Sequence, residues 1–170
     1  SGADKLVLNT AIFKNLNLIK ELNQEYGKQC IVGSVDIKTH GGTIEFFINN
    51  GGDKIETPAS DPFTLVNLEY LGELFLNSID RDGTGQGYDF QLLDFLPTST
   101  KIPIIMSGGV GNYRHLIEGI NHPLVDAAST AHLFNFIGDG LHKARESLLS
   151  SGMNLASWPD ISSLDLNHDA

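Results

Sequence analysis

The sequence predicts an α/β fold with a largely parallel sheet, and three observations lead to this prediction. Short β-rich runs alternate with helical stretches five times along the 170 residues. Most of these runs are apolar throughout, which is typical of parallel strands covered on both faces. Each run ends in a polar and often glycine-rich loop, as expected where a strand leads into a crossover helix.

The elements follow one another in a regular order. The predicted strands lie at residues 5–8, 31–37, 73–77, 102–106 and 127–131. The predicted helices follow them at residues 15–26, 62–71, 89–95, 113–120 and 140–150. In the first helix, Leu16, Ile19 and Leu22 recur at helical spacing, and Gly27 supplies a stop.

The second unit carries an insertion at residues 43–57. Residues 43–48 and 53–57 have β-rich composition, and Asn49-Asn50-Gly51-Gly52 between them tolerates positive φ. This pattern predicts a β-hairpin. Because the hairpin follows the carboxyl end of a strand, it is interpreted either as a cover for a substrate or as a plain surface hairpin.

The strand and helix pattern alone allows an open doubly wound sheet or a closed barrel. No Gly-x-Gly-x-x-Gly motif opens a helix after the first strand, which weakens the dinucleotide-binding fold. Repeated short units with polar loops favour the barrel, which needs eight units in about 250 residues. Five units therefore predict one domain over residues 1–170, the C-terminal part of a barrel with strands 4 to 8.

Composition excludes several classes of partner and site. The formal net charge of -10 and pI of about 4.8 argue against nucleic-acid and anionic-membrane surfaces. Cys30 is the only cysteine, so no intrachain disulfide or thiolate metal cluster forms, and the cytoplasm is the expected compartment. The apolar runs fall far short of the roughly 20 residues of a membrane span.

Three loops are candidates for binding phosphate. They are Asp82-Gly83-Thr84, then Ser107-Gly108-Gly109-Val110-Gly111, and then Thr130-Ala131-His132. Glycines allow backbone N–H groups to approach an anion, and the loops after strands 7 and 8 form the recurring phosphate site of such barrels. The alternative is that the glycines serve tight turns only.

Asp36 is the candidate for proton transfer. It stands at the end of an apolar strand, where barrel walls can hold a carboxylate as general acid or base. The alternative is a structural ion pair with Lys38. Asp80 and Asp82 are two residues apart, so at least one of them is expected to line the barrel mouth. Histidine spacing gives no metal motif, and Ser107 lacks a nucleophile elbow.

Several motifs together resemble the cyclase subunit of imidazole glycerol phosphate synthase, the HisF family. They cover nearly the whole chain in order. They are Gly2-Ala3-Asp4-Lys5 with Asn9-Thr10-Ala11, Val35-Asp36-Ile37-Lys38, Gly72-Glu73, Ser78-Ile79-Asp80-Arg81-Asp82-Gly83-Thr84, Gly87-Tyr88-Asp89, Pro103-Ile104-Ile105, Ser107-Gly108-Gly109, Asp126-Ala127-Ala128 and Phe134-Asn135-Phe136.

This resemblance implies a (β/α)8 TIM barrel that converts a bisphosphorylated aminoimidazole ribulosyl precursor and ammonia to imidazole glycerol phosphate, without a metal or redox cofactor. It implies that Asp36 is one of two catalytic aspartates, the other belonging to a first strand outside residues 1–170. This chain alone is therefore expected to be inactive. One phosphate is assigned to Asn9 and Thr10, and the other to Asp82, Gly83, Gly108, Gly109, Ala131 and His132.

The resemblance also implies a glutaminase partner. Lys5 and Glu73 match charged positions at the N-terminal mouth, where ammonia enters, and Asp4 lies near that docking face. Lys38, Asn77 and Ser107 are expected to line the active site. Open strand edges predict association with a missing N-terminal half of the barrel or with a second copy.

Two positions depart from the family and leave alternatives open. His132 stands where the family has serine at the phosphate, and Asn77 stands where the histidine-pathway enzymes have threonine. Paralogues that deliver ammonia for sugar amidination in surface-polysaccharide biosynthesis are more similar around Asn77. A second alternative is a non-catalytic half-barrel that binds only phosphate or a partner.

Overall fold

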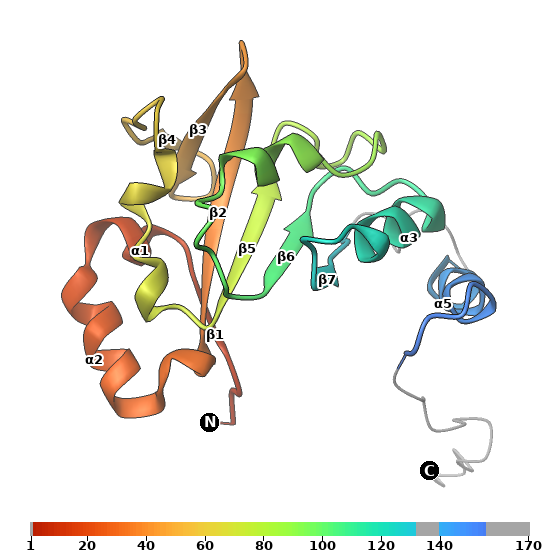
Figure 1. Cartoon of the computed structure of the whole chain (residues 1–170), viewed down its shortest axis with the longest axis horizontal. Helices are drawn as coiled ribbons and strands as arrows, with labels where there is room; N and C mark the ends of the chain where they lie inside the picture. Colours follow the sequence, from red (N-terminus) through yellow and green to blue (C-terminus); the bar gives the residue numbers. More distant parts are fainter. Residues whose placement is uncertain (1, 132–139, 156–170) are drawn as a thin grey trace, which may run out of the picture.

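A computed structural model describes residues 2–131 and 140–155, which form a mostly parallel sheet with helices packed against it (Figure 1). The strands are β1 (Leu6–Leu8), β2 (Ile31–His40), β3 (Thr43–Ile48), β4 (Asp53–Lys54), β5 (Glu73–Ser78), β6 (Ile104–Ser107) and β7 (Ala127–Ala128). The α-helices are α1 (Thr10–Lys14), α2 (Leu16–Tyr26), α3 (Tyr113–Asn121) and α5 (Gly140–Ser150). The 3-10 helices are η1 (Lys28–Cys30), η2 (Pro62–Leu65), η3 (Leu68–Tyr70) and η4 (Phe90–Phe95).

The parallel strands stand in the order in which they occur in the chain. β1 pairs with β2, β2 with β5, β5 with β6 and β6 with β7. A doubly wound sheet reverses its strand order at a switch point, whereas a barrel adds each new strand beside the previous one. Because these strands show no such reversal, the predicted α/β class and partial-barrel arrangement are confirmed.

Alternation along the strands separates a buried face from a half-buried one. The buried face belongs to one core with the helices. Its side chains with 0% exposure include Val35, Ile37, Leu74, Leu76 and Met106. Burying each such side chain stabilises the fold by about 1.5–3 kcal/mol. The residues between them, on the other face of the sheet, stay half-buried, and this second face carries the polar side chains considered below.

Two of the predicted helices are 3-10 helices and not α-helices. Residues 62–71 form η2 and η3, because Val66 between them is extended and places its own side chain in the core. Residues 89–95 give the 3-10 helix η4, in which the adjacent Leu92 and Leu93 are both buried. The amides of Leu92 and Leu96 donate to the carbonyls of Asp89 and Leu93, three residues earlier, which is the 3-10 pattern and not the α-helical one.

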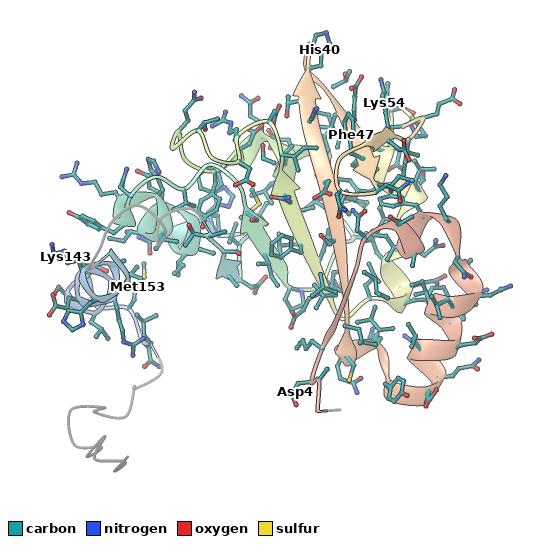
Figure 2. The ribbon with its side chains drawn as sticks, turned by 180° about the vertical axis from the view of Figure 1, so that it is seen from behind. Asp4, His40, Phe47, Lys54, Lys143 and Met153 are labelled. Atoms are coloured by element: carbon teal, nitrogen blue, oxygen red, sulfur yellow. The ribbon has the colours of Figure 1, made fainter. Side chains whose placement is uncertain are left out.

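Some strand limits also differ from the prediction. β2 continues to His40, because its last residues pair with β3 rather than with a parallel neighbour. Figure 2 shows His40 at the tip of this long strand. β6 begins at Ile104 and β7 ends at Ala128, so residues 129–131 belong to a loop. Helix α1 is an element that the sequence pattern did not predict.

The insertion at residues 43–57 contains β3 and the short β4, which pair antiparallel. Asn49 and Asn50 have φ of 54° and 58°, so the turn uses the left-handed conformation that asparagine tolerates. β3 also pairs antiparallel with residues 36–40 at the end of β2, on the same edge of β2 that pairs with β1 at residues 31–33. The hairpin is thus fixed to the strand that carries Asp36.

Among the described residues, no helix combines the length and the apolar character that crossing a membrane requires.

Candidate functional site

Three polar residues form a row across the half-buried face of the sheet. Asp36 on β2 is in register with Asn77 on β5, and Asn77 is in register with Ser107 on β6. The Asn77 amide donates a hydrogen bond of 2.9 Å from Nδ2 to Oδ1 of Asp36. The three strands thus present an ordered polar row near their carboxyl ends, where ligands bind in parallel α/β folds.

Lys38 does not pair with Asp36. Its ammonium lies 4.6 Å from the centroid of the Phe47 ring, a cation–π contact between β2 and the insertion. No ion pair joins Lys38 to Asp36 in the part of the chain that the structure describes. The alternative of a structural ion pair is therefore not supported.

A cavity of about 250 Å³ opens beside the polar row, at the carboxyl ends of β5, β6 and β7. Its lining comes from the ends of β5 and β6 and from the loops that follow β5, β6 and β7. The lining residues are Phe75, Asn77, Asp82, Ser107, Gly108, Gly109, Val110, Ser129, Thr130 and Ala131. Asp82 is the only charged residue among them, so an anion bound here would depend on neutral donors.

Such donors are present in the loop after β6. Gly108, Gly109 and Val110 are buried, yet none of their amide N–H groups donates a hydrogen bond within the described residues. Buried backbone N–H groups are almost always paired, so three consecutive unpaired ones indicate a place for an acceptor. Backbone amides of this kind bind phosphate in many α/β proteins.

Glycine is required in this loop by close backbone packing. Gly109 has φ of 90°, and a Cβ there would lie 2.1 Å from the carbonyl oxygen of Gly87. The amide of Gly87 in turn donates a hydrogen bond of 2.7 Å to the carbonyl of Gly109. The two glycine-rich loops therefore contact each other directly through their backbones.

The loop after β7 supplies a hydroxyl from Thr130, the first residue of the third candidate phosphate loop. Oγ1 of Thr130 is buried and has no hydrogen-bond partner among residues 2–131 and 140–155. The preceding residue, Ser129, accepts a hydrogen bond of 2.8 Å at its carbonyl from the Tyr88 hydroxyl. Desolvation in this buried position raises the pKa of Tyr88 above its ordinary value.

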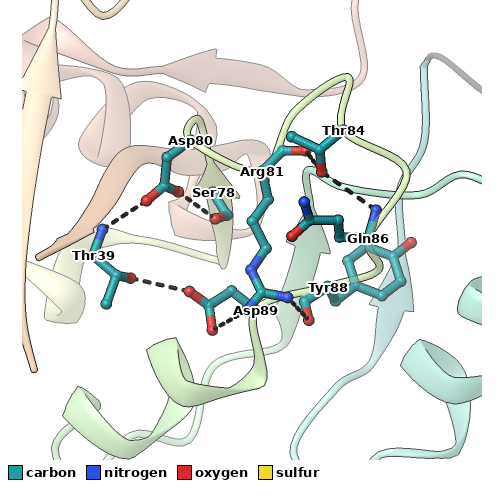
Figure 3. Close-up of polar contacts among 8 residues, drawn as sticks. All are labelled: Thr39, Ser78, Asp80, Arg81, Thr84, Gln86, Tyr88 and Asp89. Atoms are coloured by element: carbon teal, nitrogen blue, oxygen red, sulfur yellow. Dashed lines mark hydrogen bonds and ion pairs between the residues drawn. The ribbon is translucent and has the colours of Figure 1, made fainter.

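The acidic residues after β5 have different surroundings. Asp82 lines the cavity, and its backbone amide donates to the carbonyl of Ser78. Asp80 instead accepts hydrogen bonds from the backbone amide of Thr39 and from the Ser78 hydroxyl (Figure 3). Gly83 has φ of 75° in the turn that follows. Of the two aspartates, Asp82 alone lines the cavity.

Asn9 and Thr10 lie apart from this cavity, against the turn between β3 and β4. The Asn9 amide donates to the carbonyls of Ser34 and Phe47, at 3.0 and 3.4 Å. The Thr10 hydroxyl lies 3.2 Å from Oδ1 of Asn49 and accepts from the backbone amide of Asn49. The two predicted phosphate positions are thus separate places on the same end of the sheet.

The charged residues expected at the N-terminal mouth come together at the opposite end. The Lys5 ammonium forms an ion pair with Glu73 and donates to the carbonyl of Gln29 at 3.2 Å. Asp4 is exposed beside Lys5, far from the tip of β2 (Figure 2). The cavity and this ion pair therefore occupy opposite ends of the parallel strands.

A larger hollow of about 520 Å³ lies beside the start of β6, with Lys101, Asp94 and Asp126 among its lining residues. It contains none of the predicted site residues. No cluster of three metal-ligating side chains occurs in the described part of the chain. His132 lies outside the described residues.

Sequence reasoning missed Phe75 and Ser129 as lining residues, whereas Val110 and Thr130 belong to loops that it named as phosphate candidates. Phe75 lies in an apolar predicted strand, and because side chains alternate along a strand it shares a face with Asn77, two residues further on. Ser129 follows β7 directly, a place where polar residues in such folds meet ligands. That position was the available signal.

Comparison with known proteins gives a consistent result. Residues 1–138 match the model of a family described as "Histidine biosynthesis protein". The chain is 39% identical over 164 residues to a "Putative imidazole glycerol phosphate synthase subunit hisF2" of Parasynechococcus marenigrum (strain WH8102), covering 96% of this chain. It is 38% identical over 160 residues to an "Imidazole glycerol phosphate synthase subunit HisF" of Chloroherpeton thalassium, covering 89% of this chain.

A third relative, the corresponding HisF subunit of Chlorobium limicola, is 37% identical over 154 residues, again covering 89% of this chain. The chain spans 61% of the length of each of these three relatives.

Proposed function

The chain belongs to the histidine biosynthesis protein family, and we propose on this basis that it forms part of the cyclase subunit of an imidazole glycerol phosphate synthase. In this reaction ammonia and a bisphosphorylated aminoimidazole ribulosyl precursor give imidazole glycerol phosphate. The three relatives described above carry the name of this synthase, which supports the histidine-pathway substrate over a sugar.

The unpaired amides of residues 108–110 are the observation that carries this proposal. A phosphate at the cavity would accept hydrogen bonds from these N–H groups and from the Thr130 hydroxyl, with Ala131 and the 82–83 turn beside it. The second phosphate of the precursor would lie near Asn9 and Thr10, with the Asp36 row between the two ends.

Asp36 is proposed as a general acid or base. Asn77 fixes Oδ1 by a hydrogen bond, which leaves Oδ2 available to give or take a proton. Ser107 and Asn77 line the cavity on one side of this carboxylate. Since the family's second catalytic aspartate lies outside residues 1–170, we expect this chain alone to bind the precursor without completing turnover.

The ion pair of Lys5 and Glu73 supports a role for the opposite end of the strands in ammonia entry, with a glutaminase subunit docked near Asp4. The cytoplasm is the proposed compartment, in agreement with the single, half-buried and unbridged Cys30.

Calorimetric titration with the bisphosphorylated precursor and with inorganic phosphate tests the proposal. We expect both to bind, and the precursor to bind more tightly because it occupies two phosphate sites. Ser107→Asp places a carboxylate beside the proposed phosphate, and we expect it to weaken phosphate binding by at least about tenfold through repulsion.

Ser60→Asp is the matched control, since it adds the same charge at an exposed position outside the cavity. Equal phosphate affinities of the two variants would show that the cavity is not the phosphate site.

A further inference from the structure

Arg81 connects the two ends of the glycine-rich loop at residues 82–87. Its Nη1 donates a hydrogen bond of 3.4 Å to the carbonyl of Tyr88, and its Nη2 lies 3.6 Å from Oδ1 of Asp89 (Figure 3). Arg81 immediately precedes the loop and the other two residues follow it. The guanidinium therefore closes the base of the loop without lining the cavity itself.

Asp89 extends these contacts to β2. It is only 3% exposed, and its Oδ2 accepts a hydrogen bond of 3.0 Å from the Thr39 hydroxyl. Its Oδ1 has no hydrogen-bond partner in the described residues, so the Arg81 charge compensates it. A buried carboxylate that loses its cation is strongly unfavourable, which holds the two residues together.

The same group of residues reaches the other two loops of the cavity. The Tyr88 carbonyl accepts a hydrogen bond from Arg81, and the Tyr88 hydroxyl donates one to the carbonyl of Ser129. The amide of Gly87 donates to the carbonyl of Gly109. A continuous set of contacts thus runs under the cavity from Thr39, three residues after Asp36, to Ser129.

We propose that Arg81 and Asp89 are positioning residues of the phosphate site, which hold the 82–87 loop against the loops after β6 and β7 and in fixed relation to the strand of Asp36. The identity of the ligand rests on the proposed function. The positioning itself can be measured without any ligand.

Electrostatics and positioning predict opposite results for one substitution. Asp89→Asn removes a negative charge near the site, so charge alone would strengthen phosphate binding. If Asp89 acts by holding Arg81 and Thr39, the same substitution weakens binding. Arg81→Gln weakens binding under either explanation, so Asp89→Asn is the decisive variant.

The experiment compares wild type, Arg81→Gln, Asp89→Asn and the double variant in the full chain. Amide hydrogen exchange of residues 82–87 is measured without ligand, and the dissociation constant for inorganic phosphate by calorimetry. We expect exchange to accelerate and phosphate affinity to fall by about tenfold in each single variant, as for the loss of one charged hydrogen-bonding group. The double variant should be no worse than either single one.

Lys54→Gln is the matched control, because it breaks the exposed ion pair with Glu45 on the insertion and should leave both measurements unchanged. Thr39→Val removes only the hydroxyl contact to Asp89, and it should give a smaller change of the same sign even where Asp89→Asn does not fold.

The positioning role would be overturned if Asp89→Asn or Thr39→Val exchanged the amides of residues 82–87 at the wild-type rate and bound phosphate as tightly as wild type, or more tightly. Should wild type bind no phosphate, the proposed function fails, and loop exchange alone then decides whether the two residues hold the loop.

Discussion

At the scale of single residues, the contacts of Asn77 and Thr130 distinguish this site. Asn77 orients the carboxylate of Asp36 and also lines the cavity, so it connects the proposed acid–base group to the proposed phosphate site. Thr130 offers a buried hydroxyl in that site. Both are side chains whose role depends on neighbours from other strands.

Thr130→Val keeps the shape of the side chain and removes its hydroxyl. If this hydroxyl binds phosphate, the variant should lose about five- to tenfold in phosphate affinity, the value of one hydrogen bond. Thr130→Ser keeps the donor and should bind as wild type does. Calorimetry on the two variants decides, and equal affinities would exclude the contact.

Tyr88 gives a prediction for pH. Its pKa is raised in the folded chain by desolvation, whereas the unfolded value is about 10. Its stabilising contribution is therefore complete below pH of about 10, and it declines as pH rises because only the unfolded state releases the proton.

We expect Tyr88→Phe to cost about 1 kcal/mol near neutral pH, through loss of the hydrogen bond to Ser129. Urea unfolding of both proteins from pH 7 to pH 11 should show this difference shrinking above pH of about 10. A constant difference across that range would contradict the assignment.

At the scale of elements, periodicity predicted the parallel strands well because their apolar runs are distinctive. It failed for residues 62–71, where the extended Val66 interrupts the helical pattern, and for the α1 helix, which has only five residues. The glycine-rich loops were found from composition. Their mutual contact, Gly87 against Gly109, depends on strand order and could not be read from either loop alone.

Backbone packing of these loops predicts a large effect at Gly109. Alanine there meets the carbonyl oxygen of Gly87 and must also adopt positive φ. Gly109→Ala should lower the free energy of unfolding by more than Gly152→Ala and abolish phosphate binding.

Gly152 has a similar φ of 85°, but nothing lies within 4 Å of its Cβ position. Its substitution should therefore cost only about 1–2 kcal/mol, the conformational term. Equal losses for the two variants in urea unfolding would show that the loops do not pack as described.

At the scale of the whole molecule, one core connects all the parallel units, from Ile12 on α1 to Leu148 on α5. We therefore propose that residues 1–170 unfold as one domain. The repeated units in the sequence predicted this arrangement and the three candidate loops, while the strand order shows that these loops surround one cavity.

Leu76→Ala should lower the free energy of unfolding by about 2–5 kcal/mol, since this central core side chain is 0% exposed. Val7→Ala on β1, where the side chain is 62% exposed, should change it by less than about 0.5 kcal/mol. Circular dichroism and amide NMR signals should follow the same transition; two separate transitions would contradict a single domain.

We propose that the loops after β5, β6 and β7 form a phosphate site beside Asp36. Its most direct test is an NMR titration of the ¹⁵N-labelled chain with inorganic phosphate. We expect saturable shifts of the amide signals of Gly108, Gly109 and Val110, with those of α2 unaffected. Saturating phosphate that leaves those three signals unmoved would contradict it.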